Sequence, residues 1–428
     1  MAKIIKKRQN TGFYPRLYYS PVFQNLKKIV KQVTGLSMFE KIKKKIMPAH
    51  KALMQIKNPE NYSKELNGVN IVGYLSSENG LGEAARSVVA TIRSTGVKVA
   101  LKNITGNLAR KEDERFANTH IKNLPFKISI FVLDINLLLR YYRTGGLISG
   151  HNIGFLNWEL ENFPSEWAGA LDLLDEIWVP SSFTADSVSK VAMCPVVKIP
   201  YGINIECNSD FDRSHFGIPD KKFVFLFVFD FFSVFERKNP IGLIQAFKHA
   251  FKKNDDVLLI IKCSNHDKFL NEYNKMVSES KGYPVKIINK YLSRAELDGL
   301  FNICDCYVSL HRAEGFGLTI AEAMYLGKPV IATGYSSNID FMNINNSFPV
   351  KYSITELQED REPYRKGDAW AEPDIAHAAK MMRFVFENKK EAKKIGEIAA
   401  EDIRTYFNHK KVGAVMKQRL NKINYLIQ

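Results

Sequence analysis

The sequence has few cysteines and no pattern that would pair them. Five occur among 428 residues, an odd number without regular spacing, so we expect no disulfide framework and a reducing, cytosolic environment. Cys304 and Cys306 are separated by one residue, but no second Cys or His pair lies near them in the sequence. A zinc site is therefore not expected there, and buried strand positions are the preferred interpretation.

Long hydrophobic runs are also missing. The longest apolar stretch, FVFLFVFDFFSVF at 223–235, has 13 residues and contains Asp230, whereas a membrane-spanning helix needs about 18 or more. Such a stretch is typical of a buried strand followed by a loop. The first residues, MAKIIKKRQNTG, include no apolar region of signal-peptide length, so we do not expect secretion.

Negative charge is scarce in one part of the chain. Residues 1–64 hold 15 Lys or Arg and 2 acidic residues, a net charge of +13, whereas the whole chain carries +16. Within 22–47, apolar residues recur every three to four positions and lysines fill most of the others. This pattern predicts an interfacial helix on an anionic membrane. A helix docked on the body or on a partner is the alternative, and nucleic acid is not expected because no binding module accompanies the lysines.

Short apolar runs alternate with helical patterns from Val69 onward. The predicted strands form two series: 69–75, 97–102, 128–133, 153–157, 176–180 and 195–200, then 223–229, 257–262, 285–290, 306–310 and 329–333. Predicted helices lie between them, at 83–95, 165–174, 240–252, 294–302 and 318–326. This alternation predicts parallel sheets covered on both faces.

We therefore expect an α/β fold with two doubly wound, Rossmann-like domains and a basic helical N-terminal extension. The expected boundaries are 1–64 for the extension, 65–200 for the first domain, 201–405 for the second, and 406–428 for a C-terminal helix that could return to the first domain.

Residues 314–324, EGFGLTIAEAM, combine two carboxylates with a flexible turn just after a predicted strand. Open parallel sheets bind ligands beyond the carboxyl ends of their strands. Gly315 and Gly317 allow a tight turn, and a helix starting near Leu318 would present free N–H groups to a phosphate. Glu322 would point back toward the same ligand and accept hydrogen bonds from a sugar diol. The alternative is a glycine turn followed by a helix with exposed glutamates, because a lone Gly-x-Gly is weak evidence.

The flanks of this stretch, LHRAEGFGLTIAEAMYLGKPVIATGYSSNIDFM, resemble the retaining glycosyltransferases of family 4. That family has the GT-B fold, so the resemblance implies that the two Rossmann-like domains face a cleft. The signature of the family is Glu-x7-Glu in a Gly-Phe-Gly context followed by GKPVIAT. Three further segments are similar to that family: its N-terminal glycine loop (73–88), its basic phosphate loop (235–247), and the WAEPD segment of its polymer-building branch (370–374). The resemblance covers about residues 68–410.

The resemblance implies roles for the residues of the two loops. Glu314 would contact the donor sugar near the reacting centre, and Glu322 would hold the ribose hydroxyls. Lys238 would neutralise the diphosphate leaving group, where fixed cations stabilise developing charge. Backbone amides around the sugar and diphosphate would come from Phe316, Gly317, Leu318 and Thr319.

The match is incomplete at two places. The family often has an arginine several residues before the lysine, but Phe232 or Ser233 stands there. Arg237 either substitutes for it in donor binding or is a solvated neighbour. Gly80 and Gly82 match the glycine loop, with capping of the following helix as the alternative.

The second departure concerns a catalytic histidine that several family members carry after a strand of the first domain. The comparable strand ends here in Asn157, Trp158 and Glu159. Asn157 or Glu159 would then orient the acceptor hydroxyl, and a packing or hydrogen-bonding role is the alternative for each.

Together these features predict a retaining, metal-independent hexosyltransferase without a cofactor. It would take a nucleotide sugar in 201–405 and a saccharide or lipid-linked saccharide acceptor in 65–200, and extend a bacterial surface polysaccharide such as lipopolysaccharide or capsule. Mannose from GDP-mannose is the first guess for the donor. The expected location is the cytoplasm, peripheral at the inner face of the cytoplasmic membrane through residues 1–64. The main alternative is a non-catalytic sugar-binding or scaffold subunit on the same fold, and a GT-B phosphorylase is a weaker one.

Overall fold

The computed structural model describes residues 65–105, 110, 113–116, 124–143, 150–205 and 210–427. Both sheets belong to one compact unit, formed by residues 63–135 and 151–428, while α5 (Ile135–Arg143) belongs from Asn136 onward to a separate unit. The predicted basic helix at 22–47 lies outside the described residues. Within the described residues, no helix is long and apolar enough to cross a membrane.

The first sheet has six parallel strands in the order β2-β1-β3-β4-β5-β6. Its strands are β1 (Glu65–Gly73), β2 (Lys98–Asn103), β3 (Phe126–Val132), β4 (His151–Phe155), β5 (Glu176–Val179) and β6 (Val196–Lys198). The helices among them are α4 (Gly80–Arg93), η3 (Ser165–Trp167), α6 (Ala168–Leu171) and α7 (Ser182–Ser189). The helix expected at 165–174 is thus shorter than predicted and begins as a 3₁₀ turn.

The second sheet also has six parallel strands, in the order β12-β11-β10-β7-β8-β9. Its strands are β7 (Phe223–Asp230), β8 (Val257–Ser264), β9 (Val285–Ile288), β10 (Cys306–Ser309), β11 (Val330–Thr333) and β12 (Phe348–Val350). Renumbered from β7, this is the order 3-2-1-4-5-6 of dinucleotide-binding sheets, in which the strand order reverses between β7 and β10. The expected two doubly wound α/β domains are therefore confirmed.

The helices of the second sheet follow its strands in the usual alternation. They are η4 (Phe231–Ser233), α8 (Phe235–Lys238), α9 (Pro240–Ala250), η5 (His266–Lys268), α10 (Leu270–Ser280), α11 (Arg294–Ile303), α12 (Leu318–Tyr325), η6 (Ser336–Asp340), α13 (Ile375–Glu387) and α14 (Lys389–Tyr406). An antiparallel hairpin of β13 (Tyr352–Glu356) and β14 (Ala369–Pro373) is inserted before α13. Sequence analysis did not predict this hairpin as a structural element.

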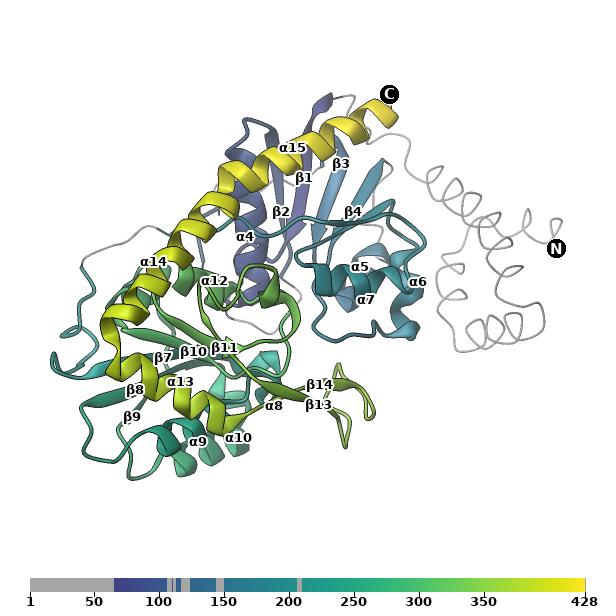
Figure 1. The fold of residues 1–428 in the computed structure, drawn as a ribbon. Coiled ribbons are helices and arrows are strands. Elements are labelled where there is room, and N and C mark those ends of the chain that lie inside the picture. The colour runs from purple at the N-terminus through teal and green to yellow at the C-terminus, as the bar shows by residue number, and fades with distance from the viewer. Residues whose placement is uncertain are drawn as a thin grey trace. The chain divides into compact units, whose positions relative to one another are not determined.

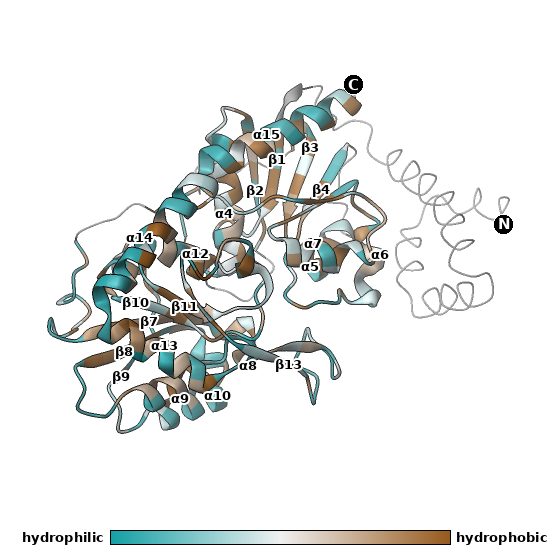
Figure 2. Cartoon of the chain, in the orientation of Figure 1, coloured by the Kyte–Doolittle hydropathy of each residue, from teal (hydrophilic) through white to brown (hydrophobic). Residues whose placement is uncertain are grey.

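Burial explains why the strands could be recognised. Every residue of β7 from Phe223 to Phe229 is buried, as an apolar strand between two helical layers requires. Figure 2 shows hydrophobic residues gathered on the sheets and hydrophilic residues along much of α14 and α15.

The last helix, α15 (His409–Leu426), packs against α4 of the first sheet (Figure 1). Lys417 Nζ donates to the carbonyl of Thr95 at 3.0 Å, and Ser94 Oγ donates to the carbonyl of His409 at 3.0 Å. A Cβ at Gly413 would lie 2.7 Å from the carbonyl oxygen of Thr91, so a larger residue could not pack as closely. The C-terminal helix therefore joins the two parts of the unit.

Candidate active site

A buried ion pair lies where the strand order of the second sheet reverses. Strands β7 and β10 are neighbours, and the chain after them supplies Lys238 at the end of α8 and Glu314 in the loop before α12. Lys238 Nζ donates directly to Glu314 Oε1. Arg237 Nη1 lies 3.5 Å from Glu314 Oε2. Two cations thus face one carboxylate at the ligand-binding edge of the sheet.

Glu314 is ionised in this setting. It is only 9% exposed, and burial by itself would raise its pKa. The charges of Lys238 and Arg237 outweigh burial and hold the pKa at about 2. Burial lowers the pKa of Lys238, against the opposing attraction of Glu314. The lysine and the glutamate therefore depend on each other for their charged states.

Arg237 is fixed by backbone carbonyls. It is 4% exposed, its Nε donates to Ser233 O at 3.1 Å, and its Nη1 donates to Ala313 O at 2.8 Å. It is therefore not a solvated neighbour of Lys238. The bond to Ala313 connects α8, which ends at Lys238, to the loop that contains Glu314. A direct role of Arg237 in donor binding stays a prediction.

The turn after Glu314 has the backbone shape that the glycines suggested. Gly317 has φ +90° and precedes the first residue of α12, Leu318. This left-handed conformation favours glycine, and the N–H groups of the first turn of α12 have no partner within the helix. The Phe316 ring packs 5.3 Å from the ring of Tyr201, centroid to centroid. Thr319 Oγ1 accepts a hydrogen bond from Tyr307 at 2.8 Å.

Glu322 lies on α12 and is buried at 6% exposure, so the alternative of exposed glutamates is wrong for both Glu314 and Glu322. Glu322 Oε1 lies 2.7 Å from Arg294 Nη1 of α11. Burial raises the pKa of Glu322 to about 7, although Arg294 opposes the shift. Near neutral pH this carboxyl is therefore partly protonated, whereas Glu314 is ionised.

The glycine loop of the first sheet begins α4. Asn79 caps the helix by accepting from Gly82 N at 2.8 Å. A Cβ at Gly82 would lie 2.0 Å from the carbonyl oxygen of Ser77, so only glycine fits there. A Cβ at Gly80 would meet nothing within 4 Å. The capping alternative thus describes Gly82, whose N–H donates to the N-cap Asn79, and donor binding by Gly80 and Gly82 stays a prediction.

The loop after β4 contacts residues of the second sheet. Glu159 Oε2 accepts from the hydroxyl of Tyr364 at 3.0 Å, and the charge of Glu159 acts on both Arg237 and Lys238. Asn157 Nδ2 donates to Tyr201 Oη at 2.8 Å. A Cβ at Gly315 would lie 3.5 Å from Asn157 Cβ. Asn157 and Glu159 therefore lie beside the Glu314 loop and its cations.

His311 supports the Glu314 loop instead of facing a ligand. It is fully buried, with Nδ1 3.1 Å from Ser309 Oγ and Nε2 3.0 Å from Asn338 Oδ1. Burial lowers its pKa. A buried imidazole with both nitrogens satisfied holds the strand end in place.

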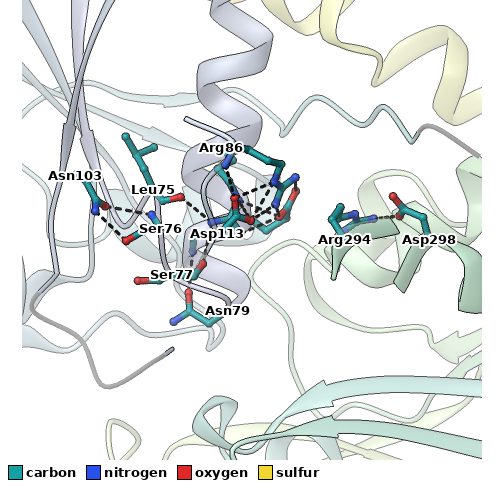
Figure 3. Close-up of polar contacts among 12 residues, drawn as sticks. Leu75, Ser76, Ser77, Asn79, Arg86, Asn103, Asp113, Arg294 and Asp298 are labelled. Carbon is teal, nitrogen blue, oxygen red and sulfur yellow. Dashed lines mark hydrogen bonds and ion pairs between the residues drawn. The ribbon is translucent and has the colours of Figure 1, made fainter. Parts of the chain in front are cut away.

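Several charged residues near the predicted site were not expected (Figure 3). Glu83 Oε2 lies 2.9 Å from Arg86 Nη2 and 2.7 Å from Arg115 Nη2. Arg294 of the second sheet interacts electrostatically with Glu83. Of these residues, only Glu83 and Arg86 lie in a segment that the sequence singled out, the glycine loop at 73–88. No sequence pattern indicated a role for Arg294.

Among the described residues, no group of three or more His, Cys, Asp or Glu is arranged to hold a metal ion. Metal independence itself stays a prediction.

Comparison with known proteins agrees with the geometry. Residues 208–402, somewhat less than half of the chain, match the family model of the group 1 glycosyl transferases. No curated protein matches the sequence. HepE from Anabaena, solved with UDP and glucose, is 14% identical over 83% of this chain and 99% of its own, with a TM-score of 0.59. Sucrose-phosphate synthase from Thermosynechococcus elongatus is 13% identical over 84% of this chain and 100% of its own, with a TM-score of 0.61. These structural likenesses show that the chain has the GT-B fold.

Proposed function

We propose that this protein is a glycosyltransferase that uses a nucleotide diphosphate sugar. The observation that carries the proposal is the Lys238–Glu314 ion pair at the β7/β10 reversal, beside the Gly317 turn that opens α12. A lysine and helix N–H groups suit a diphosphate, and a carboxylate next to them suits a sugar hydroxyl. The matched family model spans the residues that contribute this geometry.

The proposed chemistry is a retaining transfer at the front face of the donor. The bond between the anomeric carbon and the diphosphate oxygen breaks, and the acceptor oxygen bonds to the same face of that carbon. The acceptor proton passes to the departing phosphate. Lys238 would stabilise the negative charge that develops on the leaving group, Glu314 would position the sugar, and Asn157 or Glu159 would orient the acceptor hydroxyl.

The test is a screen of nucleotide sugars for binding and hydrolysis by the wild-type chain. GDP-mannose is the first proposed donor, and UDP-glucose and UDP-galactose are the principal alternatives. Tight binding of one donor with slow hydrolysis would support a transferase. Binding of free sugars without any hydrolysis or transfer would favour a non-catalytic sugar-binding subunit, and binding of neither would reject the proposal.

Transfer should not require a divalent metal. The support is the Lys238 ammonium after β7 and the N-terminus of α12 after β10, which together would supply positive charge for the diphosphate. We expect full activity after dialysis against EDTA, measured with the donor found in the screen. Activity that disappears with EDTA and returns with added Mg²⁺ or Mn²⁺ would contradict this expectation.

We further propose that residues 1–64 hold the enzyme at an anionic membrane, where it extends a lipid-linked surface polysaccharide. The supporting observation is their net charge of +13, since each lysine near such a surface contributes about 1 kcal/mol. Full-length protein should co-sediment with anionic vesicles, less so in high salt, and a chain lacking 1–64 should not. Equal sedimentation of both would exclude the membrane role. A lower melting temperature of the truncated chain would instead indicate a helix docked on the body.

A further inference from the structure

Arg294 touches the carboxylate that we expect to hold the donor ribose. It is the first residue of α11, and a capping box between Ser293 and Glu296 fixes where this helix begins. Its Nη1 lies 2.7 Å from Glu322 Oε1, and its Nη2 forms an ion pair with Asp298. The guanidinium is thus held by its own helix while one side points to α12.

The positive charge of Arg294 also influences Glu83 on α4, a helix of the first sheet. Glu83 lies in the first turn of α4, where burial raises its pKa but the charges of Arg294, Arg86 and Arg115 lower it well below the usual range. Arg294 is the strongest of these three cations in its effect on Glu83. Figure 3 shows Arg294 with Asp298 on one side and Arg86 with Asp113 on the other.

The ionisation of Glu322 depends on its burial and on charged residues of α4 and α11. Glu83 of α4 and Asp298 of α11 are both acidic and raise its pKa, and burial raises it further. Tyr307 of β10 also senses Glu322 but is neutral, because burial raises the pKa of its phenol. Arg294 is therefore the cation that opposes protonation of Glu322 most strongly.

We propose that Arg294 is a positioning residue for the nucleotide: it holds the Glu322 side chain in place as the hydrogen-bond acceptor for two vicinal hydroxyls. This inference rests on the proposed function and specifies how its donor site is organised. Nothing in the sequence motif marks Arg294, so its role follows from the contacts alone.

The expected consequence is a binding defect that depends on pH. Loss of a neighbouring opposite charge moves a carboxyl pKa by roughly 1–3 units. Starting from about 7, Glu322 in Arg294→Met would be mostly protonated at pH 7 and ionised again near pH 9 or above. A protonated carboxyl accepts fewer hydrogen bonds from a diol. Nucleotide binding should therefore weaken strongly at pH 7 and recover toward alkaline pH.

The experiment measures the Kd of UDP and of GDP by calorimetry between pH 6 and pH 9. We expect Arg294→Met to bind about tenfold more weakly than the wild type at pH 7, with the loss shrinking by pH 9. Arg419→Met is the matched control, because Arg419 pairs with the buried Glu176 away from this site. Its affinity should equal that of the wild type at every pH.

Each outcome decides the proposal. Equal affinity of Arg294→Met and wild type, or a loss that is the same at every pH, would overturn it while the proposed function stands. If the wild type binds neither UDP nor GDP nor any donor in the screen, the proposed function fails and this inference fails with it. Should Arg294→Met not fold, Arg294→Lys retains the charge without the planar guanidinium. It should bind a few-fold more weakly with an unshifted pH midpoint, and wild-type affinity in Arg294→Lys would overturn the proposal.

Discussion

Replacement of Lys238 by methionine should lower the rate of sugar transfer by about two to three orders of magnitude, or about 3–4 kcal/mol of barrier. Its ammonium is buried against Glu314 at the ends of β7 and β10, where a departing diphosphate would accumulate charge. Charge stabilisation in a buried site is stronger than in water, because the surroundings screen it less. Single-turnover kinetics with saturating donor would measure the loss.

A second variant separates this effect from simple loss of an ion pair. In Lys238→Met, Glu314 keeps only the more distant Arg237 at 3.5 Å, so part of the defect could come from an uncompensated buried carboxylate. The double variant Lys238→Met/Glu314→Gln removes that charge. If Lys238 acts on the leaving group, the double variant is far slower than Glu314→Gln alone, because Glu314 itself is expected to position the sugar. A double variant as fast as Glu314→Gln alone would show that Lys238 only balances Glu314.

The matched control is Lys248→Met. Lys248 also pairs with a glutamate, Glu279, at 2.7 Å, but it lies near the end of α9 and away from the strand ends. We expect its transfer rate to remain close to that of the wild type. A similar rate loss in both lysine variants would mean that the assay reports folding and not catalysis.

The sheets could be predicted from the sequence because buried parallel strands are continuous apolar runs. All eleven predicted strands occur in the structure within a few residues of their expected positions. The strand β12 was missed because it has only three residues, Phe348–Val350, one of which is proline. The hairpin was missed because β13 is short and mostly exposed, and its apolar residues Tyr352 and Ile354 are not buried.

The core of the site was predictable for a topological reason. Loops that follow adjacent parallel strands meet at one edge, so motifs after β7 and β10 had to lie together once the strand order was known. Contacts between those loops and the rest of the chain were not predictable. Tyr364 reaches Glu159 across 205 residues of sequence, and its place depends on a hairpin that no pattern indicated.

The charge states of the two site carboxyls could not be predicted from the sequence either. Glu314 and Glu322 are two similar carboxylates eight positions apart, yet the pKa of one is held at about 2 and that of the other is raised to about 7. The difference comes from their neighbours. Lys238 and Arg237 lower the pKa of Glu314, whereas at Glu322 the effect of Arg294 is opposed by burial and by the acidic Glu83 and Asp298. Such neighbours come from separate elements, so only the folded chain determines them.

The pKa of Glu322 also sets how its own replacement should behave. Glu322→Ala should weaken binding of the nucleotide sugar by roughly 2–4 kcal/mol, because two hydrogen bonds from a diol to a buried carboxylate are lost. The carboxyl is ionised above its pKa of about 7 and protonated below it. The difference between wild type and variant should therefore be largest near pH 8.5 and shrink as the pH falls toward 6.

Calorimetry with the donor identified in the screen would measure this difference at both pH values. Glu279→Ala provides the control, since Glu279 pairs with Lys248 on α10 and α9, outside the proposed donor site. Glu322→Gln adds a further comparison: the amide has nearly the shape of the acid but cannot ionise, so its affinity should not vary with pH over this range. Unchanged donor affinity in a folded Glu322→Ala variant would remove Glu322 from the donor site. A wild-type affinity that is flat between pH 6 and pH 8.5 would instead contradict the ionised carboxylate as the group that binds the ribose.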